Sequence, residues 1–125
     1  MFDAGSTTGA SAEKIRVKRS DVYWCRFDPA EGSEMGKTRP CVIVSLDSLN
    51  SALPTVVVCP LTSVLRPHWR TRLQITCDGM SADICAEQIR AISKKRLQRK
   101  IGTLSTKETE ALQELLGEMY GAKVK

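Results

Sequence analysis

The fold is set by Asp21-Val22-Tyr23-Trp24-Cys25-Arg26-Phe27 and, after a long loop, by Cys41-Val42-Ile43-Val44-Ser45-Leu46. Both segments are rich in β-branched and aromatic residues, which favours strands. Residues 55–62 are almost continuously apolar, and this pattern predicts a central strand that is buried on both faces. Because Pro60 has no N–H to give to a sheet, we expect the end of that strand to lie at an edge or a bulge.

The next part of the chain predicts more short strands. Residues 73–77 alternate between apolar and polar side chains, and Asp78-Gly79 predicts a tight turn after them. We expect one further strand within residues 82–92 and a last short strand at residues 101–104. A short helical turn over residues 47–53 should be capped by Asp47 or Ser48.

The C-terminal part predicts one amphipathic helix. Ser105-Thr106-Lys107-Glu108 matches the capping box, so a helix should begin there. Apolar residues then recur at helical spacing, which gives one apolar stripe for packing. The stripe consists of Ala111, Leu112, Leu115, Leu116 and Met119. The sequence therefore predicts a mainly β fold, a small barrel with a single C-terminal helix packed on it.

Composition describes an ordinary globular chain with a basic balance. The 125 residues suffice for one domain, which we place at residues 15–125 after a flexible tail of small polar residues at 1–14. No apolar run is long enough to span a membrane. The net charge of +5 favours a polyanionic partner such as nucleic acid or an acidic protein segment.

The cysteines and the histidine bear on compartment and metal binding. The five cysteines form no C-x-x-C pair, and most lie in apolar runs, which indicates free thiols in a reducing, cytoplasmic environment. His68 is the only histidine, so we expect no metal site.

The loop Gly32-Ser33-Glu34-Met35-Gly36-Lys37-Thr38-Arg39-Pro40 is the first candidate site. It exceeds the length of about two to five residues that a hairpin needs, and such loops often carry function. It is not a nucleotide-binding P-loop, because the glycine spacing is wrong and a strand rather than a helix follows Pro40. Arg39 is suited to grip a phosphate bidentately, although a surface ion pair with Glu34 is the alternative.

A second basic loop, residues 66–72, is the other candidate. Its arginines are interleaved with His68 and Trp69, a composition typical of single-strand platforms in which an indole stacks on a base. The alternative is that Trp69 covers the edge of the core. Thr62 and Ser63, at the end of the apolar strand, carry hydroxyls that either donate to a phosphate or cap a turn.

The order of motifs resembles the MazF/PemK-type toxins of bacterial toxin–antitoxin modules. The matching runs are D-V-Y-W from Asp21, G-S-E-x-G-K-T-R-P from Gly32, V-x-V-S from Val42 and C-P-L-T-S from Cys59. E-Q-I-R from Glu87, K-x-R-L from Lys94 and the final I-G-x-L-S with its helix continue the resemblance. It covers about residues 16–120, and the long N-terminal tail departs from the family pattern.

The resemblance implies an SH3-like plasmid-toxin barrel, similar to MazF and CcdB, that forms a homodimer. It also implies a sequence-specific endoribonuclease that cleaves single-stranded mRNA without metal or cofactor. The substrate's own 2′-hydroxyl would attack, leaving a 2′,3′-cyclic phosphate and a 5′-hydroxyl. The implied inhibitor is a MazE-like antitoxin with an acidic, disordered segment.

Residue roles follow from the same resemblance. The family's catalytic arginine and threonine correspond to Arg39 and Thr62, which would stabilise charge on the phosphorus and hold the phosphate in line. Glu34 and His68 are the two candidates for the proton acceptor. The residues expected to contact RNA are Ser33, Lys37, Ser63, Arg66, His68, Trp69, Arg70 and Gln88.

Two other functions compete with RNA cleavage. One is a non-catalytic, CcdB-like toxin that inhibits DNA gyrase by binding protein through the end of its C-terminal helix. The other is a plain SH3-like module that binds nucleic acid without chemistry. The presence of both Arg39 and Thr62 in matching motifs favours the ribonuclease.

Overall fold

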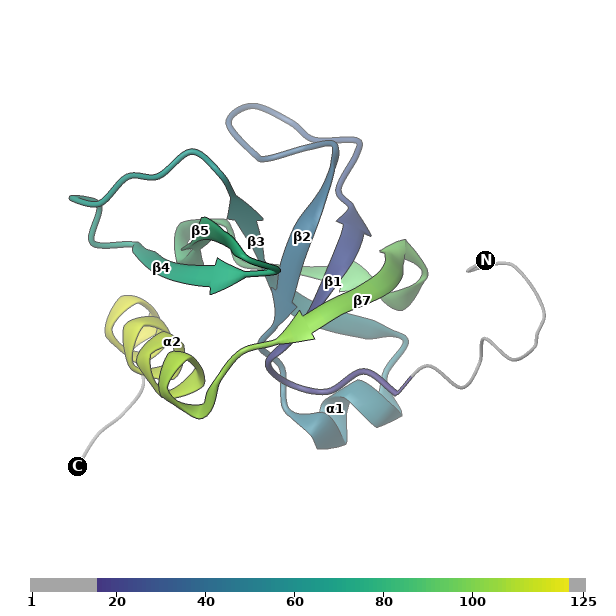
Figure 1. Ribbon diagram of the computed structural model, residues 1–125. Helices are drawn as coiled ribbons and strands as arrows, with labels where there is room; N and C mark the ends of the chain where they lie inside the picture. The colour runs from purple at the N-terminus through teal and green to yellow at the C-terminus, as the bar shows by residue number, and fades with distance from the viewer. Residues whose placement is uncertain (1–15, 122–125) are drawn as a thin grey trace.

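The computed structural model describes residues 16–121 and shows a strongly bent antiparallel sheet with a C-terminal helix packed against it (Figure 1). Seven strands follow the order β4-β5-β3-β2-β1-β7, with β6 pairing to β3 beside this path. The strands are β1 (Asp21–Arg26), β2 (Thr38–Ile43), β3 (Thr55–Thr62), β4 (Arg72–Cys77), β5 (Met80–Cys85), β6 (Arg90–Ser93) and β7 (Leu97–Thr103). The predicted mainly β fold with a C-terminal helix is confirmed. The predicted tail at 1–14 lies outside the described residues.

Two apolar cores lie on opposite faces of β1, β2 and β3. Successive residues of a strand point to opposite faces, so Tyr23 joins one core while Val22 joins the other. In the same way Val58 and Cys59 of β3 belong to different cores, and both are fully buried. The prediction that residues 55–62 form a central strand buried on both faces is confirmed.

Pro60 lies at a gap between two partner strands. The N–H of Val44 donates to the carbonyl oxygen of Val57 (2.9 Å), so the polar backbone groups of Val57 face β2 and those of Pro60 face the other side. On that side β6 pairs as far as Val58, and β5 begins opposite Leu61. The predicted edge or bulge is therefore wrong, because an interior strand accommodates proline where its partner changes.

Three predicted boundaries are corrected. Residues 82–92 do not form one strand, because the 3-10 turn η2 (Ala86–Gln88) separates β5 from β6 and lets the chain change its place along β3. β2 begins at Thr38 rather than Cys41, since β1 extends far enough to pair with it as far as Arg26↔Thr38. The last strand begins at Leu97, directly after a second turn, η3 (Lys94–Arg96).

The short helix α1 (Asp47–Ala52) forms where a helical turn was predicted, but neither predicted cap is used. Its N-cap is Leu46, without a side-chain hydrogen bond. The Asp47 carboxylate instead accepts the backbone N–H of Arg19 at 2.7 Å. The carboxylate therefore ties the helix to the segment that leads into β1.

The helix α2 (Thr106–Tyr120) begins with the predicted capping box, since Ser105 and Glu108 exchange side-chain-to-backbone hydrogen bonds. It ends at Gly121, whose φ of 78° is readily adopted by glycine. Leu112 and Leu116 pack against the core beneath β4 and β5, and the Tyr120 hydroxyl donates to the carbonyl oxygen of Ala86 at 2.8 Å. No helix within residues 16–121 is both long and apolar enough to cross a bilayer.

Candidate active site

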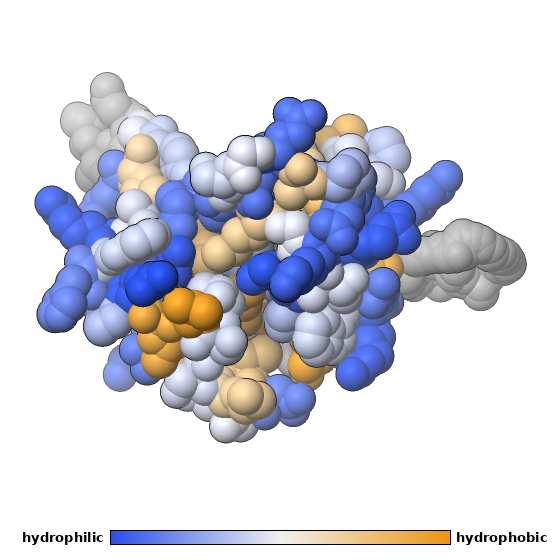
Figure 2. Space-filling model, turned by 90° about the horizontal axis from the view of Figure 1, so that it is seen from above, coloured by the Kyte–Doolittle hydropathy of each residue, from blue (hydrophilic) through white to orange (hydrophobic). Residues whose placement is uncertain are grey.

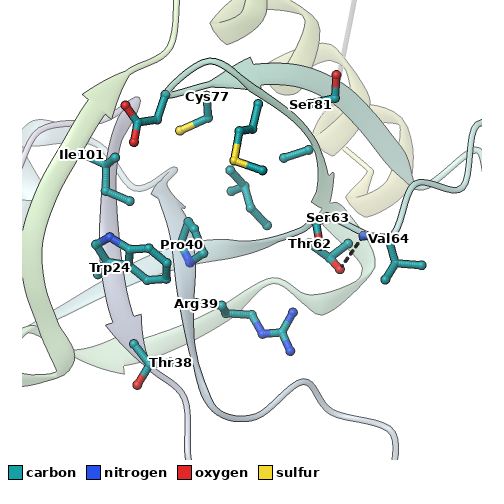
Figure 3. Close-up of a pocket in the computed structure, with 14 residues that line it drawn as sticks. Trp24, Thr38, Arg39, Pro40, Thr62, Ser63, Val64, Cys77, Ser81 and Ile101 are labelled. Atoms are coloured by element: carbon teal, nitrogen blue, oxygen red, sulfur yellow. Dashed lines mark hydrogen bonds between the residues drawn. The ribbon is translucent and has the colours of Figure 1, made fainter.

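A cleft of about 470 Å³ opens at the end of the molecule where the long loops leave the sheet (Figure 3). Its floor is formed by the start of β2 and the end of β3. Trp24 of β1 and Ile101 of β7 form one wall, and the β4–β5 turn around Asp78 forms the other. Seen from above, hydrophilic side chains border a hollow whose floor is more apolar (Figure 2).

Arg39 extends into this cleft from β2, and most N–H donors of its guanidinium have no partner among the described residues. Its Nε–H donates to the carbonyl oxygen of Gly36 at 3.1 Å. Among the described residues neither of its Nη nitrogens has a hydrogen-bond partner, so a fork of donors remains for an anion. The alternative ion pair with Glu34 does not form. The Glu34 carboxylate accepts the N–H of Glu31 at 2.9 Å instead.

Thr62 ends β3 and brings a hydroxyl to the same cleft. Its side chain is nearly buried, and its Oγ1 accepts the N–H of Val64 at 3.1 Å (Figure 3). A hydroxyl that accepts one bond still has its own proton to donate. Thr62 therefore caps the turn, which is one of its two predicted roles, and its hydroxyl proton remains to be donated. Donation to a phosphate stays a prediction. Arg39 and Thr62 line the same cleft in Figure 3.

The loop before Arg39 is closed at its base by Asp28. The Asp28 carboxylate accepts the N–H of Lys37 at 2.6 Å, and Lys37 has a φ of 67°. A Cβ at Gly36 would lie 2.6 Å from the same carboxylate oxygen, which is closer than real Cβ contacts allow. Gly36 is therefore required here, and it is the residue whose carbonyl holds Arg39.

Gln88 supports this loop from the η2 turn. Its Oε1 accepts the N–H of Met35 at 3.2 Å, and its Nε2 approaches the carbonyl oxygen of Ser33 at 3.5 Å. The side-chain amide of Gln88, which was predicted to contact RNA, thus contacts the backbone of this loop. Ser33, Glu34 and Lys37 are exposed on the loop and do not line the cleft.

The second basic loop, residues 66–72, whose last residue begins β4, is anchored at the buried carboxylate of Asp83. This carboxylate accepts the N–H of Arg66 at 2.7 Å and lies 3.5 Å from the Arg72 guanidinium, which also pairs with Glu87 at 2.9 Å. The Arg72 guanidinium in turn lies 4.5 Å from the ring centroid of Trp69, whose indole is 48% exposed. Trp69 is consequently a half-exposed surface side chain resting on Arg72, not a cover of the core edge.

The structure brings part of the predicted site together. Arg39, Thr62 and Ser63 line one cleft, whereas the side chains of the second loop are exposed beside it. Those outer residues are Arg66, His68, Trp69 and Arg70. Their contact with RNA, and the roles of Glu34 and His68 as proton acceptors, stay predictions.

Most residues that line the cleft were missed as site residues, among them Trp24, Pro40 and Ile101. The alternation of β1 contained a signal for Trp24, because it lies on the strand face opposite to the buried Tyr23 and Cys25. Nothing comparable existed for Ile101, whose orientation depends on how β7 pairs with β1.

The cleft's own thiol is unsuited to act as a nucleophile. Burial raises the pKa of Cys77 above its ordinary value, with Asp78 and Glu108 adding to the effect. The reactive form of cysteine is the thiolate, so Cys77 remains largely a protonated thiol near neutral pH. Within residues 16–121, no three His, Cys, Asp or Glu side chains are grouped to hold a metal ion. The polar groups that the cleft offers are a guanidinium fork, several hydroxyls including that of Thr62, and the carboxylate of Asp78.

Comparison with known proteins identifies solved structures of the same fold. The MazF of Deinococcus radiodurans superposes with a TM-score of 0.76 at 20% identity, covering 86% of this chain and 99% of that one. A mycobacterial endoribonuclease solved in complex with its cognate antitoxin gives a TM-score of 0.72 at 20% identity, covering 86% and 98%. The Mycobacterium tuberculosis toxin MazF-mt6 gives 0.70 at 20% identity, covering 83% and 99%. These likenesses establish a MazF-like fold. Residues 18–120 match the family model described as PemK-like, MazF-like toxin of type II toxin–antitoxin system, and the chain therefore belongs to that family.

Proposed function

We propose that this protein is the toxin of a toxin–antitoxin pair and a metal-independent endoribonuclease that cleaves single-stranded mRNA in the cytoplasm. One observation carries the proposal: the free guanidinium edge of Arg39 and the hydroxyl of Thr62 come from different strands and line the same cleft. Such a pair can bind the two non-bridging oxygens of one phosphodiester.

The reaction we infer is an internal transesterification. The 2′-oxygen forms a bond to phosphorus while the bond from phosphorus to the 5′-oxygen breaks. The products are a 2′,3′-cyclic phosphate and a 5′-hydroxyl, with one proton removed from the 2′-hydroxyl and one delivered to the leaving oxygen. Arg39 offsets the charge that develops on the phosphoryl oxygens, and Thr62 keeps the phosphate in line with the attacking oxygen.

The proton acceptor is proposed from the two loops that border the cleft. Glu34 and His68 remain the candidates. Both side chains are exposed, and the Glu34 carboxylate already accepts the N–H of Glu31. Arg39 is unsuited to the role, because a guanidinium holds its proton throughout the physiological range. Single-turnover cleavage by Glu34→Gln and by His68→Gln distinguishes the candidates, because only loss of the true proton acceptor should slow the reaction strongly.

A homodimer and an acidic antitoxin complete the proposal. Pairing two copies would place the loops of both along a shared RNA groove. The net charge of +5 suits an acidic antitoxin segment as well as RNA. A relative of the same fold has been solved with its cognate antitoxin, which supports a partner of this kind.

The test is incubation of the purified protein with a long single-stranded RNA in excess EDTA. We expect discrete fragments that end in a 2′,3′-cyclic phosphate, and sequencing of their ends gives the recognised word. Arg39→Ala should lower the rate at least about 100-fold, the usual effect of losing one such donor, without altering the circular dichroism spectrum. Arg99→Ala removes the same charge from an exposed position on β7 and should keep the activity. Intact RNA with the wild-type protein would overturn the proposal and favour a toxin that acts by binding protein.

A further inference from the structure

The cleft extends beyond Arg39 and Thr62 into an apolar compartment (Figure 3). Trp24, Pro40 and Ile101 lie together on one side of it in Figure 3. Met80 of the β4–β5 hairpin, which is 66% exposed, also lines the cleft. None of these side chains is needed to hold a phosphate, so the compartment has no role in the transesterification described above.

The pairing of β1 with β2 fixes the indole beside the phosphate-binding end. Trp24 is directly opposite Pro40 in the register, and Arg39 is the residue before Pro40. Trp24 is only partly buried, whereas its neighbours Tyr23 and Cys25 point into the core on the other face. In the register Arg39 is opposite Cys25, so its side chain alternates away from that of Trp24. The guanidinium and the indole are brought to one site because both line the cleft at this end of β2.

A bulge brings Ile101 to the same face. The register between β1 and β7 begins with Val22↔Gly102 and would continue with Tyr23 opposite Ile101, but the structure pairs Tyr23 with Lys100. The extra residue turns the Ile101 side chain from the face of Tyr23 to that of Val22 and Trp24. Bulges beside functional sites often redirect a side chain in this way.

We propose that this compartment takes one unpaired nucleobase of the RNA, stacked on the indole of Trp24, next to the phosphate held by Arg39 and Thr62. Trp24 and Ile101 are then specificity-determining residues, because their side chains supply the aromatic and aliphatic surfaces that the entering base contacts. This inference rests on the proposed function and adds to it a nucleobase subsite.

The chemistry of the cleft favours a nucleotide over other occupants. Its volume of about 470 Å³ lies in the range of small-ligand sites. The combination of an aromatic face, aliphatic walls and a cation at one end matches a base with its attached phosphate, since indoles stack on any base. A second copy of this chain would need only an apolar surface and would gain nothing from the free guanidinium edge.

The test measures whether the contribution of one base to RNA binding depends on the indole of Trp24. Each base flanking the cleaved bond is replaced in turn by an abasic unit in a short, uncleavable 2′-O-methyl RNA, and binding to wild type and Trp24→Ala is measured. At one position the abasic change should weaken wild-type binding about 5- to 150-fold, the worth of one stacked base, and leave binding to Trp24→Ala unchanged. Trp24→Phe should restore most of the lost affinity. If each abasic change weakened binding to wild type and to Trp24→Ala by the same factor, the proposed subsite would be overturned.

Fluorescence gives a readout that does not depend on cleavage. The chain has two tryptophans, so Trp69→Phe leaves Trp24 as the only indole. Its emission should be quenched when the 2′-O-methyl RNA binds, also in the Arg39→Ala background if enough RNA is added. If the protein cleaves no RNA, a pool of 2′-O-methyl RNA of random sequence is used in place of the recognised sequence. The same quenching of the Trp24 emission is expected. Unchanged emission at saturating RNA would overturn the subsite while leaving the proposed nuclease intact.

Ile101→Ala is the second variant, in case Trp24→Ala fails to fold. Enlarging the compartment should change the base preferred at that position, as seen by sequencing fragment ends, with Arg39 and Thr62 untouched. Sedimentation of Trp24→Phe and Ile101→Ala tests the other occupant. A change in oligomeric state together with an unchanged base preference would show that the compartment is covered by a second copy, and would overturn the proposal.

Discussion

The Nε–H of Arg39 donates to the carbonyl oxygen of Gly36 at 3.1 Å, so a residue of the loop holds one edge of the guanidinium while the other edge faces the cleft. This contact couples the conformation of the loop to the direction of Arg39. Asp28 and Gln88 hold this loop through hydrogen bonds to its backbone. If the loop moved, the Gly36 carbonyl oxygen would move with it and Arg39 would lose its fixed direction.

Gly36→Ala should therefore lower activity through a residue that carries no functional group. The new Cβ would meet the Asp28 carboxylate at 2.6 Å, so either this carboxylate gives up the Lys37 N–H that closes the loop or the loop itself shifts, and both changes disturb the Gly36 carbonyl that holds Arg39. We expect a fall of about 10- to 100-fold in the cleavage rate, comparable to misplacing a positioning group, with little change in thermal stability. Gly102→Ala is the matched control, since a Cβ there meets nothing within 4 Å. A fully active Gly36→Ala enzyme would show that the anchor does not matter.

Replacing Thr62 tests its hydroxyl in two ways, as a donor to the phosphate and as the cap of the turn. Thr62→Val keeps the shape but removes both the donor and the acceptor for the Val64 N–H, so we expect a rate loss of about 100-fold or more and a stability loss of about 1 kcal/mol. Thr62→Ser retains the hydroxyl and should retain most activity. Single-turnover cleavage and urea unfolding measure the two effects. A Thr62→Val enzyme that is less stable but fully active would reduce Thr62 to a structural residue.

Asp83 should be more important for stability than for chemistry. Its carboxylate is 1% exposed and serves both the Arg66 N–H and the Arg72 guanidinium. Asp83→Asn removes the charge while Arg72 keeps Glu87, so we expect a loss of about 1–3 kcal/mol in the free energy of unfolding. Lys100→Ala removes a half-exposed partner of Asp21, whose buried carboxylate keeps the hydrogen bond from the Thr103 hydroxyl, so it should cost less than Asp83→Asn. Equal costs in urea titrations would contradict the buried role of Asp83.

Buried thiols should make the protein less stable at alkaline pH. Burial raises the pKa of Cys59 from 9.0 to about 12. The folded state therefore keeps a proton that the unfolded chain releases above pH 9, and stability falls as pH rises from about 9 towards 12. The stability difference between wild type and Cys59→Ala should narrow by up to about 1.4 kcal/mol per pH unit in this window. A difference that stays constant from pH 9 to 11 would contradict it.

The sequence predicts this fold well where local patterns decide it. β-Branched and aromatic residues identified β1, continuous apolar character identified β3, and the capping box identified the start of α2, because each depends on residues close together in the chain. The break at η2 was missed, since the segment around Ala86 stops pairing only because β3 changes its partner there. Such a change depends on the sheet as a whole.

The site was predictable to a similar extent. Arg39 and Thr62 were found from motifs, and the structure shows that they line one cleft. Ile101 was not found, because its orientation depends on a bulge between two strands distant in sequence. Gln88 was expected on RNA and is found holding loop backbone, a contact that no local pattern encodes.

The central claim is that Arg39 and Thr62 act on the same phosphodiester. The most direct measurement is a crystal structure of the protein bound to the recognised RNA word with a 2′-O-methyl group at the cleavage site. We predict one phosphate whose oxygens lie about 2.7–3.1 Å from both an Arg39 Nη and the Thr62 Oγ1. A scissile phosphate bound away from this cleft, or the two side chains on different phosphates, would contradict the account.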